Sequence, residues 1–300
     1  CQTTITTSRN SHSVPGRFAP SPSGDLHLGN LRTAILAWLF AKSSDRDFVI
    51  RIENLDQQRS RPQFEQSQLA DLAALGIESD LPVVRQSERG HLYAEALARL
   101  EAAGLTYECF CTRREIAEAI TAPHAPAGTY PRTCRDLTVD EHQARRTERA
   151  PAIRLRSTEP NWTVTDLLHG PVTAPIDDFV LRRGDGAFAY NLAVVVDDAA
   201  QGVDQVVRGD DLLASAPAQA YLAQALGLPE PTYAHVPLAV NGAGQRLAKR
   251  DGAVTLRDLS APTVWELIGR SLGVRARDLA DLLAELDPTD ISTEPWVVKT

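Results

Sequence analysis

Strand-like and helix-like segments alternate over residues 14–104, and this alternation constrains the fold more than any other feature. A short strand comes first, and the apolar residues of LRTAILAWLFAKS then recur at helical spacing. The branched run FVIRIEN indicates a second strand, and the helical segments Arg61–Gly76 and His91–Gly104 each end at a glycine. Strands separated by helices of this length are typical of a parallel sheet built from crossover units. We therefore predict an α/β fold.

The alternation stops at Leu105 and later returns, which indicates an insertion. The interrupting stretch contains short alternating runs such as PAIRLRS, which favour antiparallel strands. Residues 1–13 are polar, and we expect them to be flexible. The expected order is a flexible N-terminus (1–13), the first half of the core (14–104), an inserted subdomain (105–190), the second half of the core (191–252) and a helical C-terminal segment (253–300).

The overall charge and hydropathy argue against some classes of function. The formal net charge is −8, which disfavours a protein that holds nucleic acid by a generally basic surface, although a local basic face is compatible with it. No run approaches the roughly 20 apolar residues of a membrane-spanning helix, and the start has no segment like a signal peptide. We expect a cytoplasmic protein without membrane association, whose four cysteines are thiols or metal ligands rather than disulfides.

The stretch RFAPSPSGDLHLGN leads from the first expected strand into a helix. The first N–H groups of a helix have no partner within it, and the aligned peptide dipoles favour an anion there. Gly24 and Gly29 permit close approach of the backbone, and His27 can donate a hydrogen bond from just before the helix. The stretch is compatible with a phosphate site and equally with a capping turn that carries a surface histidine.

A second glycine-rich stretch, NGAGQRLAKRDGA, encloses Lys249. Lysine is rare in this chain and occurs only at Lys42, Lys249 and Lys299. A cationic loop of this kind can close over a phosphate tail, and a solvated surface loop is the alternative reading of the same residues.

Three of the four cysteines lie near one another in sequence. Cys109 and Cys111 are separated by one residue, and Cys134 follows within the same inserted region. A closed tetrahedral zinc site needs a fourth donor, and His124, Tyr130 and His142 are all within reach in sequence. Spacing alone leaves a zinc site and a set of buried free thiols as equal alternatives.

Several ordered motifs resemble the class I aminoacyl-tRNA synthetases. HLGN at His27–Asn30 resembles their HIGH motif, and RLAKR at Arg246–Arg250 resembles their KMSKS loop. The motifs RFAPSPSGDLHLGN, RIENLD, CFC followed by GTYPRTCR, AYNLAVVVDD and VVRGDDLL resemble the glutamyl branch. The resemblance covers roughly residues 14–260 and implies a Rossmann-like nucleotide-binding core with an acceptor-type insertion stapled by zinc.

The resemblance also implies roles for individual residues. It assigns ATP binding to His27, Gly29, Asn30 and Lys249, with His27 and Lys249 acting on the phosphates together with Mg²⁺. It assigns glutamate binding to Arg17, Ser21, Glu53, Tyr190 and Arg208. The two arginines match the groups that bind the carboxylates, Glu53 matches the group that takes the ammonium, and Ser21 and Tyr190 match hydroxyl donors. The family pattern selects Tyr130 as the fourth ligand of one structural zinc ion, beside Cys109, Cys111 and Cys134.

One residue departs from the family pattern. The KMSKS loop usually has a hydroxyl residue where this sequence has Ala248, so one hydrogen bond to a phosphate is absent unless Arg250 compensates.

The length after the second motif distinguishes members of the glutamyl branch. Residues 253–300 are too few for the large anticodon-binding region of a full glutamyl-tRNA synthetase. The chain therefore resembles the short glutamyl-queuosine tRNA(Asp) synthetases, a ligase family. We expect a monomeric ligase with three partners: ATP, L-glutamate and the tRNA(Asp) anticodon stem-loop. Alternatives are a truncated enzyme that charges a tRNA 3′ end, a small nucleotidyltransferase with a similar histidine loop, and a degenerate core that acts as a binding module.

Overall fold

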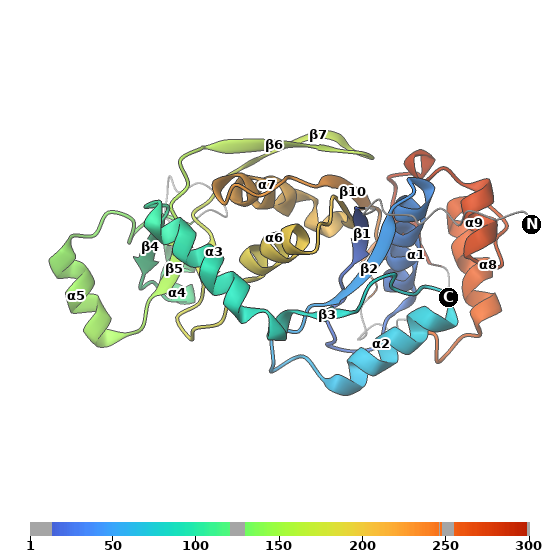
Figure 1. Cartoon of the computed structure of the whole chain (residues 1–300), viewed down its shortest axis with the longest axis horizontal. Coiled ribbons are helices and arrows are strands. Elements are labelled where there is room, and N and C mark those ends of the chain that lie inside the picture. The colour runs from blue at the N-terminus through green and yellow to red at the C-terminus, as the bar shows by residue number, and fades with distance from the viewer. Residues whose placement is uncertain (1–13, 121–129, 246, 248–254, 299–300) are drawn as a thin grey trace, which may run out of the picture.

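A mostly parallel sheet organises the molecule (Figure 1). The computed structural model describes residues 14–120, 130–245, 247 and 255–298, and within these ranges seven strands form the sheet in the order β3, β2, β1, β9, β10, β6, β7. Neighbouring strands are parallel except for β6 and β7. The strands are β1 (Pro15–Phe18), β2 (Asp47–Ile52), β3 (Val84–Arg85), β9 (Gln205–Gly209), β10 (Thr232–Val236), β6 (Asn161–Asp166) and β7 (Gly170–Pro175). The predicted α/β fold is confirmed.

Helix α1 connects β1 to β2 and is buried on nearly every side. Leu31, Ile35 and Leu39 are fully buried, because the helix lies between the sheet and the C-terminal helices (Figure 1). This position explains why its sequence is apolar almost all round. The helices are α1 (Leu28–Ser43), α2 (Pro62–Ala74), α3 (Gly90–Ala102), α4 (Arg113–Ile120), α5 (Val139–Glu148), α6 (Tyr190–Ala200), α7 (Ala216–Ala225), α8 (Ala261–Leu272) and α9 (Leu279–Glu285).

The region between the two halves of the core forms two structures. Strands β4 (Thr106–Cys109), β5 (Ala152–Leu155) and β8 (Val180–Arg182) make a separate antiparallel sheet at the end of the molecule opposite α8 and α9 (Figure 1). The β6–β7 hairpin instead joins the main sheet, where Asp166 pairs with Tyr233 of β10. Residues 161–175, expected within the inserted subdomain, therefore extend the core sheet.

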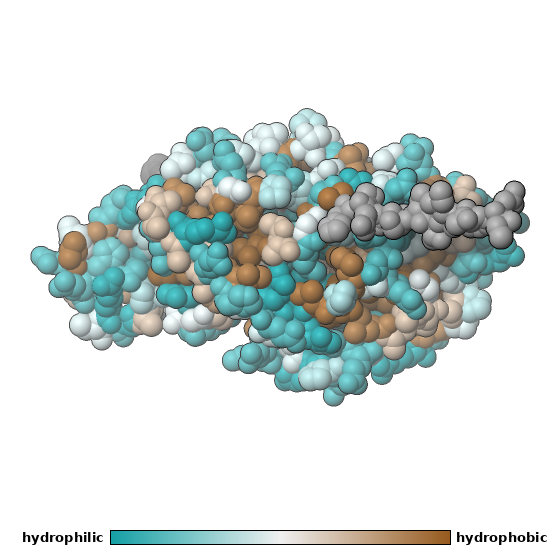
Figure 2. Space-filling model, in the orientation of Figure 1, coloured by the Kyte–Doolittle hydropathy of each residue, from teal (hydrophilic) through white to brown (hydrophobic). Residues whose placement is uncertain are grey.

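The visible face of this inserted end is mostly hydrophilic (Figure 2). Helix α5 lies at its extremity and has no buried residue. Its start is held by Thr138, whose hydroxyl accepts a hydrogen bond from the N–H of Glu141. The helix is thus stabilised by its cap and by surface ion pairs rather than by a packed core.

The C-terminal segment packs back on the core. Helices α8 and α9 cover α1, and β12 (Trp296–Val297) pairs in parallel with β11 (Ala239–Val240). The expected helical character holds for α8 and α9, while β12 adds a short strand. No helix within the described ranges is both long and apolar enough to cross a membrane.

Candidate active site

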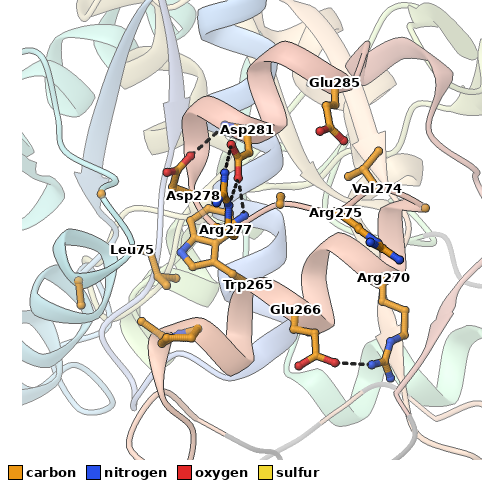
Figure 3. Close-up of a pocket in the computed structure, with 16 residues that line it drawn as sticks. Leu75, Trp265, Glu266, Arg270, Val274, Arg275, Arg277, Asp278, Asp281 and Glu285 are labelled. Atoms are coloured by element: carbon orange, nitrogen blue, oxygen red, sulfur yellow. Dashed lines mark hydrogen bonds and ion pairs between the residues drawn. The ribbon is translucent and has the colours of Figure 1, made fainter.

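Two large cavities differ in the residues that line them. The larger, of about 1420 Å³, lies between α2 and the C-terminal helices (Figure 3). Its charged side chains form local pairs, such as Arg277 with Asp281 and Arg270 with Glu266. A second cavity, of about 870 Å³, is lined by nine residues that the sequence analysis singled out: Arg17, Ser21, Gly24, His27, Gly29, Asn30, Glu53, Tyr190 and Arg208. This second cavity is the candidate active site.

The candidate site lies where the order of the sheet reverses. From β1 the chain passes to β2 on one side, and β9 occupies the other side. Arg17 belongs to β1, Arg208 to β9, and Glu53 directly follows β2. Ligands of open α/β sheets bind in the crevice outside the carboxyl ends of the strands at such a switch point. Residues far apart in sequence therefore converge here.

A buried ion network holds Arg17 in place. Its Nε and Nη2 donate to the carboxylate of Asp198 at 3.1 and 3.2 Å. Arg51 donates from Nη1 to the same carboxylate at 2.6 Å and from Nη2 to Glu53 at 3.3 Å. Burial alone would lower the pKa of Arg17, but Asp198 raises it above the ordinary value. The guanidinium therefore stays charged at the cavity wall.

Glu53 and Tyr190 also line the cavity, and Glu53 belongs to the same ion network through its bond from Arg51. Burial raises the pKa of the Glu53 carboxyl, although Arg51 and Arg17 oppose the shift. Burial also raises the pKa of the Tyr190 hydroxyl, and the neighbouring Glu53 adds to the effect. Tyr190 stays neutral and can donate a hydrogen bond, while Glu53 is the anion that a cationic guest would stabilise.

Arg208 is fixed from three directions. Its Nε donates to Nε2 of His235 at 3.0 Å, its Nη1 donates to Oε1 of Gln219 at 2.8 Å, and its Nη2 donates to the carbonyl of Leu212 at 3.4 Å. Each terminal nitrogen carries a second hydrogen for a ligand in the cavity.

His27 caps helix α1. Its Nδ1 accepts a hydrogen bond from the N–H of Asn30 at 3.3 Å, and its own N–H donates to Oδ1 of Asn30 at 3.4 Å. Because Nδ1 accepts, the proton of the neutral ring is on Nε2. A Cβ on Gly29 would come within 3.1 Å of the His27 ring and 3.0 Å of Ala239, so a side chain at this position would require one of these neighbours to shift.

Lys249 lies outside the described residues, as do Arg246, Ala248 and Arg250 of the same motif. Leu247 lines the cavity and donates its N–H to the carbonyl of Ala239 at 3.1 Å. Thr255, beyond the motif, forms a β-bridge with His27. The described residues on both sides of Lys249 thus adjoin the candidate site.

Three cysteines and a tyrosine converge in the inserted subdomain. The Oη of Tyr130 lies 3.2 Å from Sγ of Cys109 and 3.5 Å from Sγ of Cys111, and the latter lies 3.5 Å from Sγ of Cys134. Donors at tetrahedral zinc distances are separated by about 3.7 Å, so these spacings fit such an ion. Cys109, Cys111 and Cys134 therefore form a candidate metal site.

A smaller cavity of about 670 Å³ adjoins the candidate active site. It shares Ser21, Glu53 and Tyr190 with that site and extends between the core and the inserted sheet. Phe188 and Leu55 contribute apolar surface, and Asp56, Arg183 and Asp185 contribute charges. The shared residues Ser21, Glu53 and Tyr190 can thus be reached from the side of the inserted subdomain as well.

Several residues around the site were missed by sequence reasoning. Arg51 and Asp198 stand in the buried runs FVIRIEN and AVVVDDA, where unpaired charges are unfavourable. Charged residues in apolar runs could have been recognised from the sequence, because a buried arginine and a buried aspartate stabilise each other as an ion pair. His235 and Gln219 gave no comparable signal, because either residue is compatible with a strand or helix interior.

Known proteins resemble the chain over most of its length. A family model described as "tRNA synthetases class I (E and Q), catalytic domain" matches residues 13–265. A glutamyl-Q tRNA(Asp) synthetase from Nocardia farcinica is 60% identical over 94% of this chain and 92% of its own length. Another, from Symbiobacterium thermophilum, is 47% identical over 82% of this chain and 81% of its own length.

A solved structure shares the fold. The crystal structure of a glutamate tRNA ligase from Elizabethkingia meningosepticum, in complex with its amino acid, superposes with a TM-score of 0.81 at 26% identity. The match covers 95% of this chain and 67% of that one.

Proposed function

The chain belongs to the glutamyl-Q tRNA(Asp) synthetase family of class I synthetases, and from this premise we propose that it activates glutamate with ATP and transfers it to queuosine in the anticodon of tRNA(Asp). The observation that carries this proposal is the convergence of Arg17, Glu53, Arg208 and the start of α1 on one cavity. Because ATP and tRNA are cytoplasmic substrates, we expect the reaction in the cytoplasm.

The cavity offers the charges that glutamate requires. Glutamate has two carboxylates and one ammonium group. Arg17 and Arg208 supply two guanidinium groups for the carboxylates, and Glu53 supplies the anion for the ammonium. Ser21 and Tyr190 supply hydroxyls. Glutamine presents an uncharged amide with two donors, so a site built on guanidinium donors rejects it strongly.

ATP is proposed to bind at the start of α1. The N–H of Gly29 in the first turn of α1 and Nε2–H of His27 are proposed to donate to phosphate oxygens. Asn30 holds His27 in place, because its N–H donates to Nδ1 of that ring. Lys249 contributes its charge from the neighbouring loop, a proposal that the positions of Leu247 and Thr255 support. Mg²⁺ bound with ATP neutralises phosphate charge. Attack of a glutamate carboxylate on the α-phosphate forms glutamyl-adenylate and releases pyrophosphate. Positioning of the reactants and electrostatic stabilisation of the transition state accelerate this step.

The acceptor nucleoside is proposed to enter through the smaller cavity. A hydroxyl oxygen of queuosine attacks the α-carbonyl carbon of glutamyl-adenylate. The new ester bond forms as the bond to the AMP oxygen breaks, and the hydroxyl proton is released. The shared residues Ser21, Glu53 and Tyr190 put both reactants at one place.

One structural zinc ion is proposed at Cys109, Cys111, Tyr130 and Cys134. Thiolate donors suit zinc, and four donors close a structural site with no open position for catalysis. The guanidinium of Arg154 lies 3.6 Å from the centre of the Tyr130 ring. A cation there favours ionised ligands. The ion would fix the inserted subdomain beside the acceptor nucleoside.

The assay that tests the function uses two tRNA preparations. Labelled glutamate is offered with bulk tRNA from cells that make queuosine and from cells that cannot. We expect label only in the queuosine-containing preparation. Equal labelling of both would indicate charging of a 3′ end, and labelling of neither would indicate a nucleotidyltransferase or a binding module.

Glutamate binding is expected to weaken in mild acid. The ammonium of glutamate needs the ionised Glu53, whose pKa burial raises. Below that pKa the KM for glutamate should rise about tenfold per pH unit, because only the ionised fraction binds. Pyrophosphate exchange at varied pH measures this KM, with the KM for ATP as the internal control. The prediction fails if the KM for glutamate is flat down to about pH 4.3, where free glutamate itself takes up a proton.

A further inference from the structure

We propose that Asp166 and His235 form a buried relay that positions Arg208 for substrate, so that both are positioning residues of the glutamate site. The proposal rests on the proposed function, since it takes Arg208 as a group that binds a glutamate carboxylate. It goes further by assigning a part in that binding to a residue of the β6–β7 hairpin.

The relay is continuous in space. Oδ2 of Asp166 lies 2.7 Å from Nδ1 of His235, and Nε2 of His235 lies 3.0 Å from Nε of Arg208. Asp166 is 1% exposed and His235 is fully buried. His235 therefore has no surface in the cavity and acts on substrate only through Arg208.

The hydrogen bonds determine the protonation state of the histidine. Arg208 has only donors, so Nε2 of His235 must accept. The proton of the ring is then on Nδ1 and is donated to Asp166. Burial lowers the pKa of His235, against the opposing hydrogen bond to Asp166, which agrees with a neutral ring. The carboxylate of Asp166 thus selects the tautomer that Arg208 needs.

Asp166 is itself held by the turn of the hairpin. Its Oδ1 accepts the N–H groups of Leu168 and His169 at 2.9 and 3.1 Å, and its Oδ2 also accepts the N–H of His235 at 3.1 Å. These bonds direct the carboxylate towards His235. Burial alone would raise the pKa of Asp166, but the hydrogen bond from His235 and those from the turn lower it, so the group stays ionised.

The neutral imidazole has an electrostatic consequence at the cavity. Arg17 touches the carboxylate of Asp198 directly, so part of its charge is compensated before substrate arrives. Arg208 instead touches a neutral ring, with the carboxylate of Asp166 one residue further away. Arg208 is oriented through its Nε while its positive charge remains available to a substrate carboxylate.

The test compares four variants in glutamate-dependent pyrophosphate exchange. In Asp166→Asn one of the two accepting oxygens is replaced by an NH₂ donor. The variant therefore disturbs either the hydrogen bonds of the turn or the tautomer of His235. His235→Leu removes the acceptor for Arg208, and His235→Gln restores one at similar reach. His169→Ala is the matched control, because His169 contacts the carbonyl of His235 at 2.9 Å from the same hairpin without touching Arg208. Thermal unfolding of each variant is measured alongside.

The expected result is a change in the KM for glutamate with the KM for ATP retained. Asp166→Asn and His235→Leu should each raise the KM for glutamate about tenfold or more, the usual effect of a lost hydrogen bond to a charged group. His235→Gln should recover most of the loss, and His169→Ala should resemble wild type. Wild-type KM values for glutamate in folded Asp166→Asn and His235→Leu would overturn the relay. So would equal rises in the KM for glutamate and for ATP, or the same rise in His169→Ala.

Failure of the proposed function gives a different result. If the wild-type enzyme shows no glutamate-dependent exchange, the function is wrong whatever the variants do. If wild type exchanges and the variants match it, only the relay is wrong.

Discussion

Glu53→Gln is expected to lower kcat/KM for glutamate activation by at least about 100-fold, because the ammonium of the substrate would enter a buried site without its counter-charge. The substitution keeps the size of the side chain. Arg51 retains Asp198 at 2.6 Å and Gln201 at 3.1 Å, so the cavity wall keeps its main contacts. The loss should therefore reflect the substrate rather than the fold. Initial rates of glutamate-dependent pyrophosphate exchange measure it.

A matched control separates the site from charge removal in general. Glu65→Gln removes a carboxylate that pairs with Arg85 at 2.6 Å on α2, away from the cavity. We expect near wild-type exchange from this variant and an unchanged KM for ATP in both. Exchange by Glu53→Gln within threefold of wild type would contradict the assignment of Glu53 to the ammonium.

Cys134→Ser is expected to remove the zinc ion and to lower transfer of glutamate to tRNA about 100-fold or more, while pyrophosphate exchange falls only a few-fold. Loss of a thiolate from a closed structural site costs much of the folding energy that the metal supplies. Sγ of Cys134 also accepts the N–H of Phe110 at 3.4 Å, which ties the two halves of the site together. Glutamate activation depends on residues of the core and should survive.

Wild type and Cys134→Ser are compared in three measurements on the same preparation. These are zinc content by elemental analysis, hydrogen exchange across residues 105–160, and the rates of pyrophosphate exchange and of transfer to tRNA. Cys1→Ser is the control for loss of a thiol outside the cluster. Stoichiometric zinc in a folded Cys134→Ser protein would refute the proposed ligand set. Equal loss of exchange and transfer would show that the insertion supports the whole enzyme rather than its acceptor side.

The local parts of the fold were readable from the sequence. The helical periodicity of residues 31–43 and the branched run at 48–54 identified α1 and β2, because each pattern reports one element and its buried face. The β6–β7 hairpin was assigned to the insertion, because its partner β10 is distant in sequence and alternation does not say which strand a segment will pair with. Pairing across such a distance depends on the whole core.

Some residues of the candidate site could likewise be predicted from the sequence, and others could not. His27, Arg17 and Glu53 stand in contiguous motifs that resemble a known family, so their positions were available before the structure. Asp166 and His235 belong to no such motif, and their importance comes from a 2.7 Å contact between two segments. A residue that acts on substrate only through another residue is difficult to recognise from a single sequence.

The free edges of the main sheet have a consequence for solubility. At one edge, β3 has only two residues. At the other edge, the N–H of Ile176 donates to the carbonyl of Pro160 on the β6 side. Backbone N–H groups alternate in direction along a strand, so the backbone positions 171, 173 and 175 of β7 face away from β6. Two of these three are Pro171 and Pro175, which have no N–H to offer. An approaching strand from another molecule finds Thr173 as the single outward backbone donor among them, so the sheet is protected against edge-to-edge aggregation.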